Sequence, residues 1–318
     1  MTAYLIRRIG TSVVILIGIS IFVFVLLHSV FPSPAIVVLG PRAAPKAVAA
    51  WNAQNGFSDP VIVQYWRYMY ALLQGNLGYS YKLNQSVAAL FNERWARSLY
   101  LSGMGILVAV LIAIPLGIYQ AVRRNTFGDQ AVTAVAFTAY AMPDFFLYLI
   151  AIQVFAISLP IFGFEASQST SILTVIGDWR DMALPILCIA VLVLAGYSRY
   201  MRSSAMDILA QDYIRTARAK GLSERLVLFR HLLRNACLPM ITLIGLSIPA
   251  LLAGNLIAEY AFNYAGLGLL FYNSLGQRGL PGADRVHPDR RGADRGGQLR
   301  GRRRADHRRP PYPAQVSS

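Results

Sequence analysis

The stretch DYIRTARAKGLSERLVLFRHLLRNACLP, residues 212–239, decides the fold. It is polar and basic, whereas the sequence on both sides is apolar over lengths that span a bilayer. Such a segment is a loop at the membrane surface, and its basic residues favour the cytoplasmic side. The stretch therefore predicts an integral membrane protein with a large cytoplasmic loop.

The loop is long enough to fold into short helices. Thr216, Ala217 and Ala219 are small, so another protein's surface can approach the backbone closely. Gly221 can take a positive φ and end the first helix there. Apolar residues then recur at helical spacing and give one apolar face: Leu222, Leu226 and Phe229.

This loop resembles the EAA loop of permease subunits in bacterial ABC importers, with a small-residue cluster, a glycine and a downstream Leu-Pro pair. Arg215 stands where the general pattern has Glu. The segment DYIRTARAKGL is most similar to the dipeptide, oligopeptide and nickel branch. The resemblance implies a coupling helix that docks on the ATP-binding subunit; an ordinary amphipathic loop is the alternative. The residues assigned to this ATPase-coupling loop are Asp212, Tyr213, Arg215, Thr216, Ala217, Ala219, Lys220, Gly221, Leu222, Leu238 and Pro239.

The composition also predicts a membrane protein. The chain has 318 residues, 55% of them hydrophobic and 14% charged, with a mean hydropathy of +0.45. A soluble domain has about a quarter of its residues charged. Five long, non-alternating apolar runs predict transmembrane helices rather than a barrel: Ile9–Phe31, Leu99–Val122, Val132–Ile161, Ala183–Tyr200 and Cys237–Ala258.

Orientation follows from the basic clusters. Arg123 and Arg124 follow the second run, Arg199 and Arg202 close the fourth, and both ends are expected inside. The N-terminus is then cytoplasmic. The segment from Pro32 to about Arg97 is extracytoplasmic, with an amphipathic helix expected at 61–73 on the outer membrane face and a turn at GNLGYS, residues 75–80, which is similar to Gly-Asp-Leu-Gly-x-Ser of peptide permeases.

Three residues are candidates for the translocation path. Pro143 should kink the third run. Asp144, about a dozen residues into that run, either lines the path or is a structural carboxylate. Glu259 opens EYAFNYAGLG, which resembles the family's Glu-x-x-Phe-x-x-Pro-Gly-Leu-Gly with Ala265 in place of Pro; its role there is structural or in the path.

Catalytic motifs are absent. The sequence has no phosphate-binding loop, no His-Glu-x-x-His, no Gly-x-Ser-x-Gly and no Cys-x-x-Cys. Its four histidines are scattered, and Cys188 and Cys237 lie in or at apolar runs, so no metal site or disulfide framework is expected. The chain is predicted to be non-catalytic and to bind no cofactor.

The resemblance implies an all-α, polytopic protein with the permease fold of type I ABC importers, in the bacterial inner membrane. A second permease subunit, two ATP-binding subunits carrying ATP and Mg²⁺, an extracytoplasmic substrate-binding protein and membrane lipid are the implied partners. The expected parts are 1–98 (first helix and outer segment), 99–278 (permease core with the coupling loop at 203–236) and 279–318 (Arg-rich tail). Short peptides are the expected cargo.

Other functions stay open at this point. Nickel complexes or glutathione-like molecules are alternative cargoes. An ion-coupled secondary transporter would leave the coupling pattern unexplained. A nucleic-acid-binding or scaffold protein would rest on the tail alone, which has no folded motif, so no nucleic-acid partner is expected.

The tail from Arg278 has eleven arginines against four aspartates and cannot cross a bilayer. The family continues here with Arg-Asp-Tyr-Pro, an apolar sixth helix and an end near Asp-Pro-Arg-Ile-Arg. Read one base later, suitable synonymous codons from Gly279 onward permit DYPVLTGCILTGVVLTVGGN, and codons for residues 309–313 with the first base of Ala314 permit DPRIR. Our hypothesis is that a one-base shift near codon 278 replaced the sixth helix by an out-of-frame tail, expected to be disordered.

Overall fold

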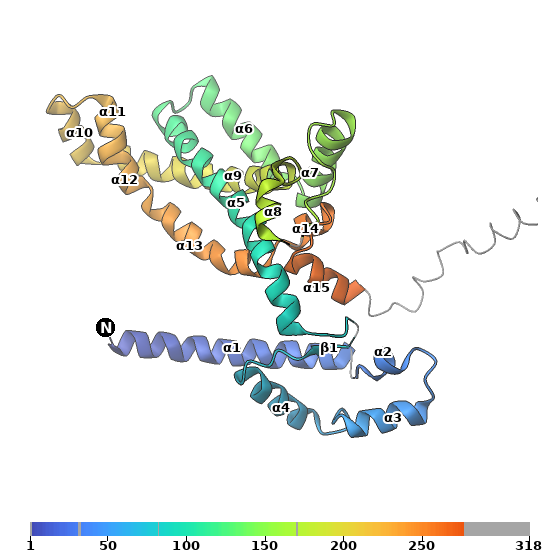
Figure 1. Cartoon of the computed structure of the whole chain (residues 1–318). Coiled ribbons are helices and arrows are strands. Elements are labelled where there is room, and N and C mark those ends of the chain that lie inside the picture. The colour runs from blue at the N-terminus through green and yellow to red at the C-terminus, as the bar shows by residue number, and fades with distance from the viewer. Residues whose placement is uncertain (1, 31–32, 82, 170, 277–318) are drawn as a thin grey trace, which may run out of the picture. The chain divides into compact units, whose positions relative to one another are not determined.

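A computed structural model describes residues 2–30, 33–81, 83–169 and 171–276 (Figure 1). The chain divides into two compact units, Met1–Leu270 and Phe271–Ser318. Of the second unit, only the end of helix α15 (Leu267–Gly276) is described. The hypotheses about the tail at 279–318 therefore lie outside the described residues.

Helices dominate the described residues, as the apolar runs predict. Helix α1 (Thr2–Val30) has 29 residues and a length of about 43 Å, enough to cross a bilayer. Helix α4 (Val61–Leu73) has the predicted bounds. It meets α1 through a 2.8 Å hydrogen bond between the hydroxyls of Ser20 and Tyr65 and through ring contacts of Phe24. Between them lie α2 (Ala35–Leu39) and α3 (Pro45–Gln54).

The expected turn after α4 is confirmed. Gly75 and Gly78 have φ of +79° and +90°, a conformation open to glycine. The turn leads into a short antiparallel hairpin of β1 (Tyr79–Ser80) and β2 (Gln85–Ser86).

Two long helices form the centre of the first unit. Helix α5 (Val87–Val122) and helix α9 (Trp179–Leu209) are longer than the predicted runs at one end and at both ends, respectively. They pack closely, and a Cβ on Gly105 or Gly117 of α5 would overlap Ile189 or Met201 of α9. Both helices continue through internal prolines, Pro115 and Pro185.

The third run is not one kinked helix. Helix α6 (Phe127–Ala141) ends before Pro143, and α7 (Asp144–Ala151) with the π-helical turn η1 (Ile152–Ser158) leaves at 106° (Figure 1). The prediction that Pro143 disturbs the helix is confirmed, but the helix is broken there and not merely kinked. The 15 residues of α6 span about 22 Å, less than the ~30 Å of a bilayer core.

The segment after α9 is a series of short helices. They are α10 (Asp212–Ala219), α11 (Glu224–Leu226), the π-helical η2 (Val227–Leu232) and α12 (Leu233–Ala236). Helix α13 (Leu238–Ala253) follows and stops short of the predicted Ala258, because Gly254 at φ +81° ends it and α14 (Leu256–Ala261) begins. The segment between the third and fourth apolar runs contains α8 (Ile172–Gly177).

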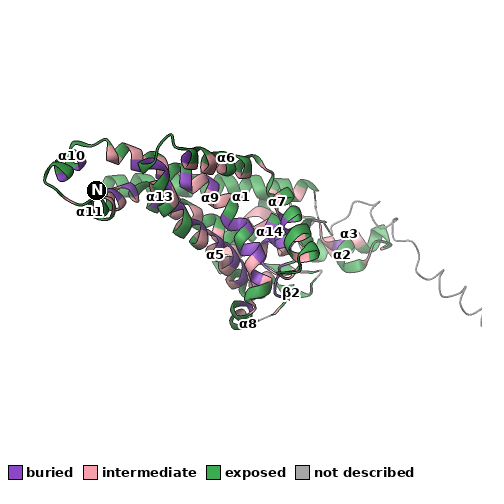
Figure 2. Cartoon of the chain, turned by 90° about the horizontal axis from the view of Figure 1, so that it is seen from above, coloured by how far each residue is buried: buried purple, intermediate pink, exposed green. Residues whose placement is uncertain are grey.

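Burial is uneven along the chain. No residue of α1 is buried, whereas buried residues gather on α5, α9 and α14 (Figure 2). One cluster centres on Tyr148, Phe262 and Tyr264, and a second joins α9 to α12 and α13 through Met201, Ala236 and others.

Three described helices are long and apolar enough to cross a membrane: α1, α5 and α9. The number rises to five if each bent pair, α6 with α7–η1 and the 224–236 segment with α13, counts as one span. The first, second and fourth predicted runs correspond to α1, α5 and α9, the third to the bent pair of α6 with α7–η1, and the fifth to α13 and the start of α14.

Candidate functional site

The coupling loop folds as a hairpin of short helices. Helix α10 lays Ile214 and Ala217, three residues apart on one face, against Val227 of η2. All three are 5% exposed or less. An apolar contact of this kind gives the hairpin a core of its own.

Polar contacts close the hairpin around that core. Arg218 Nε donates to Glu224 Oε1 at 2.9 Å, which joins α10 to α11. The Asn235 amide donates to the Tyr213 hydroxyl at 3.1 Å, which joins α10 to α12. Gly221 has φ +77° and follows the last residues of α10, so the predicted helix end is confirmed.

The structure separates the assigned coupling residues into three groups by burial. Ala217 is buried inside the hairpin, so its side chain is absent from the exposed surface, and the close approach of another protein to this small-residue cluster stays a prediction. Leu222 is half-buried against the hairpin core. The remaining assigned residues are exposed: Asp212, Tyr213, Arg215, Thr216, Ala219, Lys220, Gly221, Leu238 and Pro239.

The apolar face expected of Leu222, Leu226 and Phe229 is only partly packed. Phe229 is 71% exposed and Leu226 is 38% exposed, whereas Val227 and Leu232 are fully buried. The π-helical turns of η2 change the angular spacing, so a 3.6-residue period selects the wrong neighbours. Val227 and Leu232 were missed for this reason, although their apolar character was visible, whereas Ile214 lies in the regular helix α10 and was not singled out.

The base of the hairpin is fixed to the long helices. Ser204 Oγ of α9 donates to the Ala236 carbonyl at 3.0 Å. Met201 and Ala205 of α9 pack with Leu232 and Met240 in one buried cluster. The exposed tip of the hairpin is thereby connected to both α9 and α13.

Glu259 occupies the centre of a second site. Its carboxylate is fully buried and accepts hydrogen bonds from Ser98 Oγ at 2.7 Å, Leu269 N at 3.0 Å and Asn255 N at 3.2 Å. Burial raises the pKa of Glu259, while the hydrogen bonds from Ser98 and the backbone oppose that rise. This arrangement favours the structural role over a place in an open path.

Further contacts join the loop that carries Glu259, residues 254–269, to helix α5. Arg97 Nη1 donates to the Ala265 carbonyl at 3.2 Å, and the Tyr264 hydroxyl donates to the Arg97 carbonyl at 3.1 Å. Leu267 N donates to Ser98 Oγ at 2.7 Å. The loop 254–269 is therefore an anchor on α5 built around Glu259.

Pro143 and Asp144 lie at the break between α6 and α7. Pro143 precedes α7, and Asp144 is in its first turn, where a carboxylate is favoured by the helix dipole. Asp144 is exposed, and its side chain makes no hydrogen bond or ion pair within residues 2–30, 33–81, 83–169 and 171–276. Helix α7 packs against the α14 segment through the rings of Tyr148 and Phe262, but among the described residues no hydrogen bond or ion pair joins Pro143 or Asp144 to Glu259.

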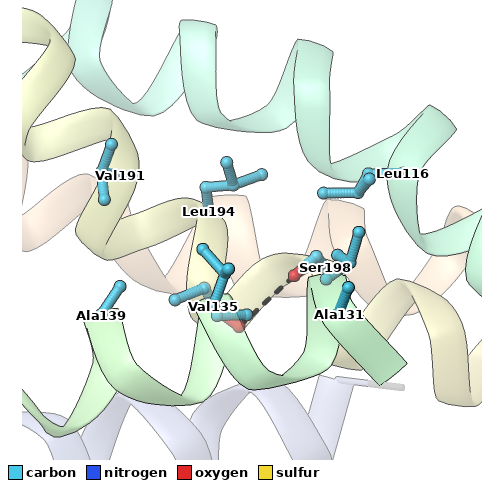
Figure 3. A pocket seen from close by; sticks show the side chains of 10 residues that line it. Leu116, Ala131, Val135, Ala139, Val191, Leu194 and Ser198 are labelled. Carbon is cyan, nitrogen blue, oxygen red and sulfur yellow. Dashed lines mark hydrogen bonds between the residues drawn. The ribbon is translucent and has the colours of Figure 1, made fainter. Parts of the chain in front are cut away.

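A cavity of about 310 Å³ lies between α5, α6 and α9 (Figure 3). Leu116, Val135 and Leu194 line it, and its only polar side chain, Ser198, donates to the Ala195 carbonyl of its own helix at 3.4 Å. It offers no free polar group to orient a ligand. In the part of the chain that the structure describes, no three His, Cys, Asp or Glu side chains gather into a metal site.

Comparison with known proteins identifies the family. Residues 113–284 match the family described as binding-protein-dependent transport system inner membrane component, and residues 1–102 match its N-terminal companion family. The chain is 36% identical over 285 residues to the oligopeptide transport system permease protein AppB of Bacillus subtilis, covering 88% of this chain and 90% of that protein.

Two further relatives give the same result. The glutathione transport system permease protein GsiC of Salmonella paratyphi A is 34% identical over 281 residues, covering 88% of this chain and 89% of the relative. A putative peptide permease protein of Brucella ovis is 36% identical over 290 residues with the same coverage. The chain belongs to the family of binding-protein-dependent transport system inner membrane components, the non-catalytic, multi-pass membrane subunits of ABC transporters.

Proposed function

We propose that this chain is one of two permease subunits of an ATP-driven importer and forms part of the translocation path for short peptides. The observation that supports this most is the hairpin of α10 to α12. It has a packed core, an exposed outer surface carrying Thr216 and Ala219, and a base fixed to α9 and α13. A packed hairpin that is joined to two long helices can transfer motion from ATP-binding subunits to the membrane spans.

In this mechanism, two partner subunits bind ATP and Mg²⁺, and this chain binds neither. Closure of the ATPase dimer displaces the hairpin, and α9 and α13 carry the displacement into the membrane. The cavity between the two permease subunits then opens to an extracytoplasmic binding protein, and hydrolysis resets it. Membrane lipid surrounds the exposed helices.

The proposed topology is that of a type I importer permease with the N-terminus in the cytoplasm. Residues 1–98 carry the first span and the outer segment, and residues 99–278 form the core around the coupling loop at 203–236. The sixth span of that fold would be the one that the tail at 279–318 replaces in the sequence.

The cargo class rests on the relatives. An oligopeptide permease and a glutathione permease match this chain at similar identity. Both cargoes carry an ammonium, a carboxylate and peptide bonds, so short peptides are our first proposal and glutathione is the second candidate.

Reconstitution in proteoliposomes tests the function. The complex of this chain with its second permease and two ATPases is supplied with its binding protein and with labelled dipeptides, longer peptides or glutathione. We expect uptake of one of these that needs both binding protein and hydrolysable ATP. Uptake that persists with a non-hydrolysable ATP analogue, or that follows an ion gradient instead, would contradict the proposal.

A further inference from the structure

A polar cluster lies at the turn between α5 and α6, apart from the coupling loop and the Glu259 anchor. Gln120 of α5, Asp129 of α6 and Arg202 of α9 meet there. Asp129 is 2% exposed and Gln120 is 3% exposed. A buried carboxylate with a charged partner is costly unless its geometry is good.

Arg202 and Asp129 form a bidentate ion pair. Arg202 Nε donates to Asp129 Oδ1 at 2.9 Å, and Arg202 Nη2 donates to Asp129 Oδ2 at 2.8 Å. Such paired bonds from the planar guanidinium fix both distance and orientation, which a single lysine bond does not.

Other donors hold the same carboxylate. Asn125 N donates to Oδ2 at 3.0 Å, and Gln120 Nε2 donates to Oδ1 at 3.4 Å. Asn125 has φ +63°, so the turn takes a left-handed conformation where its amide reaches Asp129. The start of α6 is thus held by α5 and α9 together.

The position of Arg202 on α9 places this cluster beside the residues that hold the coupling hairpin. Arg202 lies next to Met201 and two residues before Ser204, which bind the base of the hairpin. Successive helix residues point about 100° apart, so one short stretch of α9 holds the hairpin on one side and α6 on another. Helix α6 then runs to the break before Pro143.

We infer that the Asp129–Arg202 pair is the link that makes α6 move with α9 when the coupling hairpin is displaced. Both are positioning residues, which touch neither cargo nor ATP. The inference rests on the proposed import function. It adds that motion reaches the break between α6 and α7 through this pair.

The test compares cargo imported per ATP hydrolysed in the reconstituted complex. Arg202→Gln leaves the buried Asp129 carboxylate without its charged partner, and Asp129→Asn does the same to the half-buried Arg202 guanidinium, so both variants are expected to lower expression and this ratio. The double variant Asp129→Asn/Arg202→Gln leaves no unpaired charge. We expect it to recover expression and thermal stability while the import ratio stays on the order of tenfold low, as for loss of a coupling free energy between sites.

Arg202→Lys provides a second, milder variant. It keeps the positive charge but loses the bidentate geometry. We therefore expect normal expression with less cargo imported per ATP hydrolysed. The matched control is Asp59→Asn/Arg67→Gln, which removes an exposed ion pair whose side chains are 40% and 55% exposed. Both properties should be unchanged in the control.

Spin-label distances give a readout independent of transport. Labels replace exposed Phe127 of α6 and Tyr200 of α9 in a background lacking Cys188 and Cys237. We expect one distance with and without ATP in the wild type, and an ATP-dependent spread in the double variant.

Two outcomes overturn the inference: a double variant or Arg202→Lys with a wild-type import ratio, or a wild-type α6–α9 distance that changes with ATP. Failure of the proposed function looks different. In that case the wild-type complex itself imports neither peptide nor glutathione, and the distance measurement alone decides whether the two helices move together.

Discussion

Gly221 shows how one residue shapes the coupling hairpin. Its φ is +77°, and nothing outside its chain neighbours lies within 4 Å of the place where a Cβ would stand. Within this chain the left-handed backbone, and not close packing, is therefore the reason for a glycine at this position. The open space leaves Gly221 exposed at the hairpin tip.

Replacing Gly221 by valine should weaken coupling. A β-branched residue at positive φ costs about 1–3 kcal/mol, so the turn after α10 would change conformation. We expect normal membrane insertion but a clear loss of ATP hydrolysis stimulated by loaded binding protein. Gly221→Asn is the matched control, because asparagine tolerates this conformation. Full stimulation in the valine variant would contradict the prediction, and equal loss in both variants would indicate a clash with a partner instead.

Gly268 tests the Glu259 anchor. A Cβ at this position would lie 2.6 Å from Leu256 Cα and 2.7 Å from Leu256 N, so the backbone at the start of α14 would have to shift. Gly268→Ala should lower the stability by about 1–3 kcal/mol, as overpacking does. Thermal unfolding in detergent measures this effect. Gly177→Ala, at an exposed glycine with nothing within 4 Å, should melt like the wild type; equal melting of both variants would show that the anchor adapts.

At the scale of elements, the break between α6 and α7 differs most from a simple apolar run. Proline removes a backbone donor and disfavours helix in the residue before it, so α6 ends at Ala141 and α7 starts anew at Asp144. Asp144 is thereby exposed in the first turn of α7. A carboxylate in that place is available to a cationic group.

Neutralising Asp144 should alter cargo preference. If Asp144 lines the path, Asp144→Asn lowers uptake of cationic peptides about two- to fivefold relative to acidic ones, the effect of losing an exposed ion pair of ~0.5–1 kcal/mol. Competitive uptake of lysine-rich and glutamate-rich peptides measures the ratio. Glu93→Gln, an exposed carboxylate on α5, controls for net charge. An unchanged ratio, or loss of expression alone, would favour a structural role.

At the scale of the whole molecule, the tail departs from the family to which the chain belongs. The family match ends at residue 284, within the segment where apolar residues give way to arginine. Sequencing the DNA across codons 275–285 tests the frame hypothesis. We expect a one-base shift that opens an apolar frame ending in DPRIR, because both ends of the family pattern fit one frame. If no single-base change there opens such a frame, the hypothesis is wrong.

The sequence by itself determined the membrane class, the helical runs, the turn at Gly75 and Gly78, the helix end before Gly221 and the family. These follow from local chemistry: apolar length, basic clusters, glycine and proline backbone limits, and a contiguous motif. The 106° break needed the structure, since proline predicts a disruption without its angle.

Only the tertiary structure decided which side chains meet. Ala217 and Thr216 are neighbours in one small-residue cluster, yet one is buried against Val227 and the other is exposed. Asp129 and Arg202 stand 73 positions apart, so no local pattern pairs them. Glu259 meets Ser98 across 161 positions. Such contacts depend on how helices distant in sequence cross, and a single sequence carries no record of that crossing.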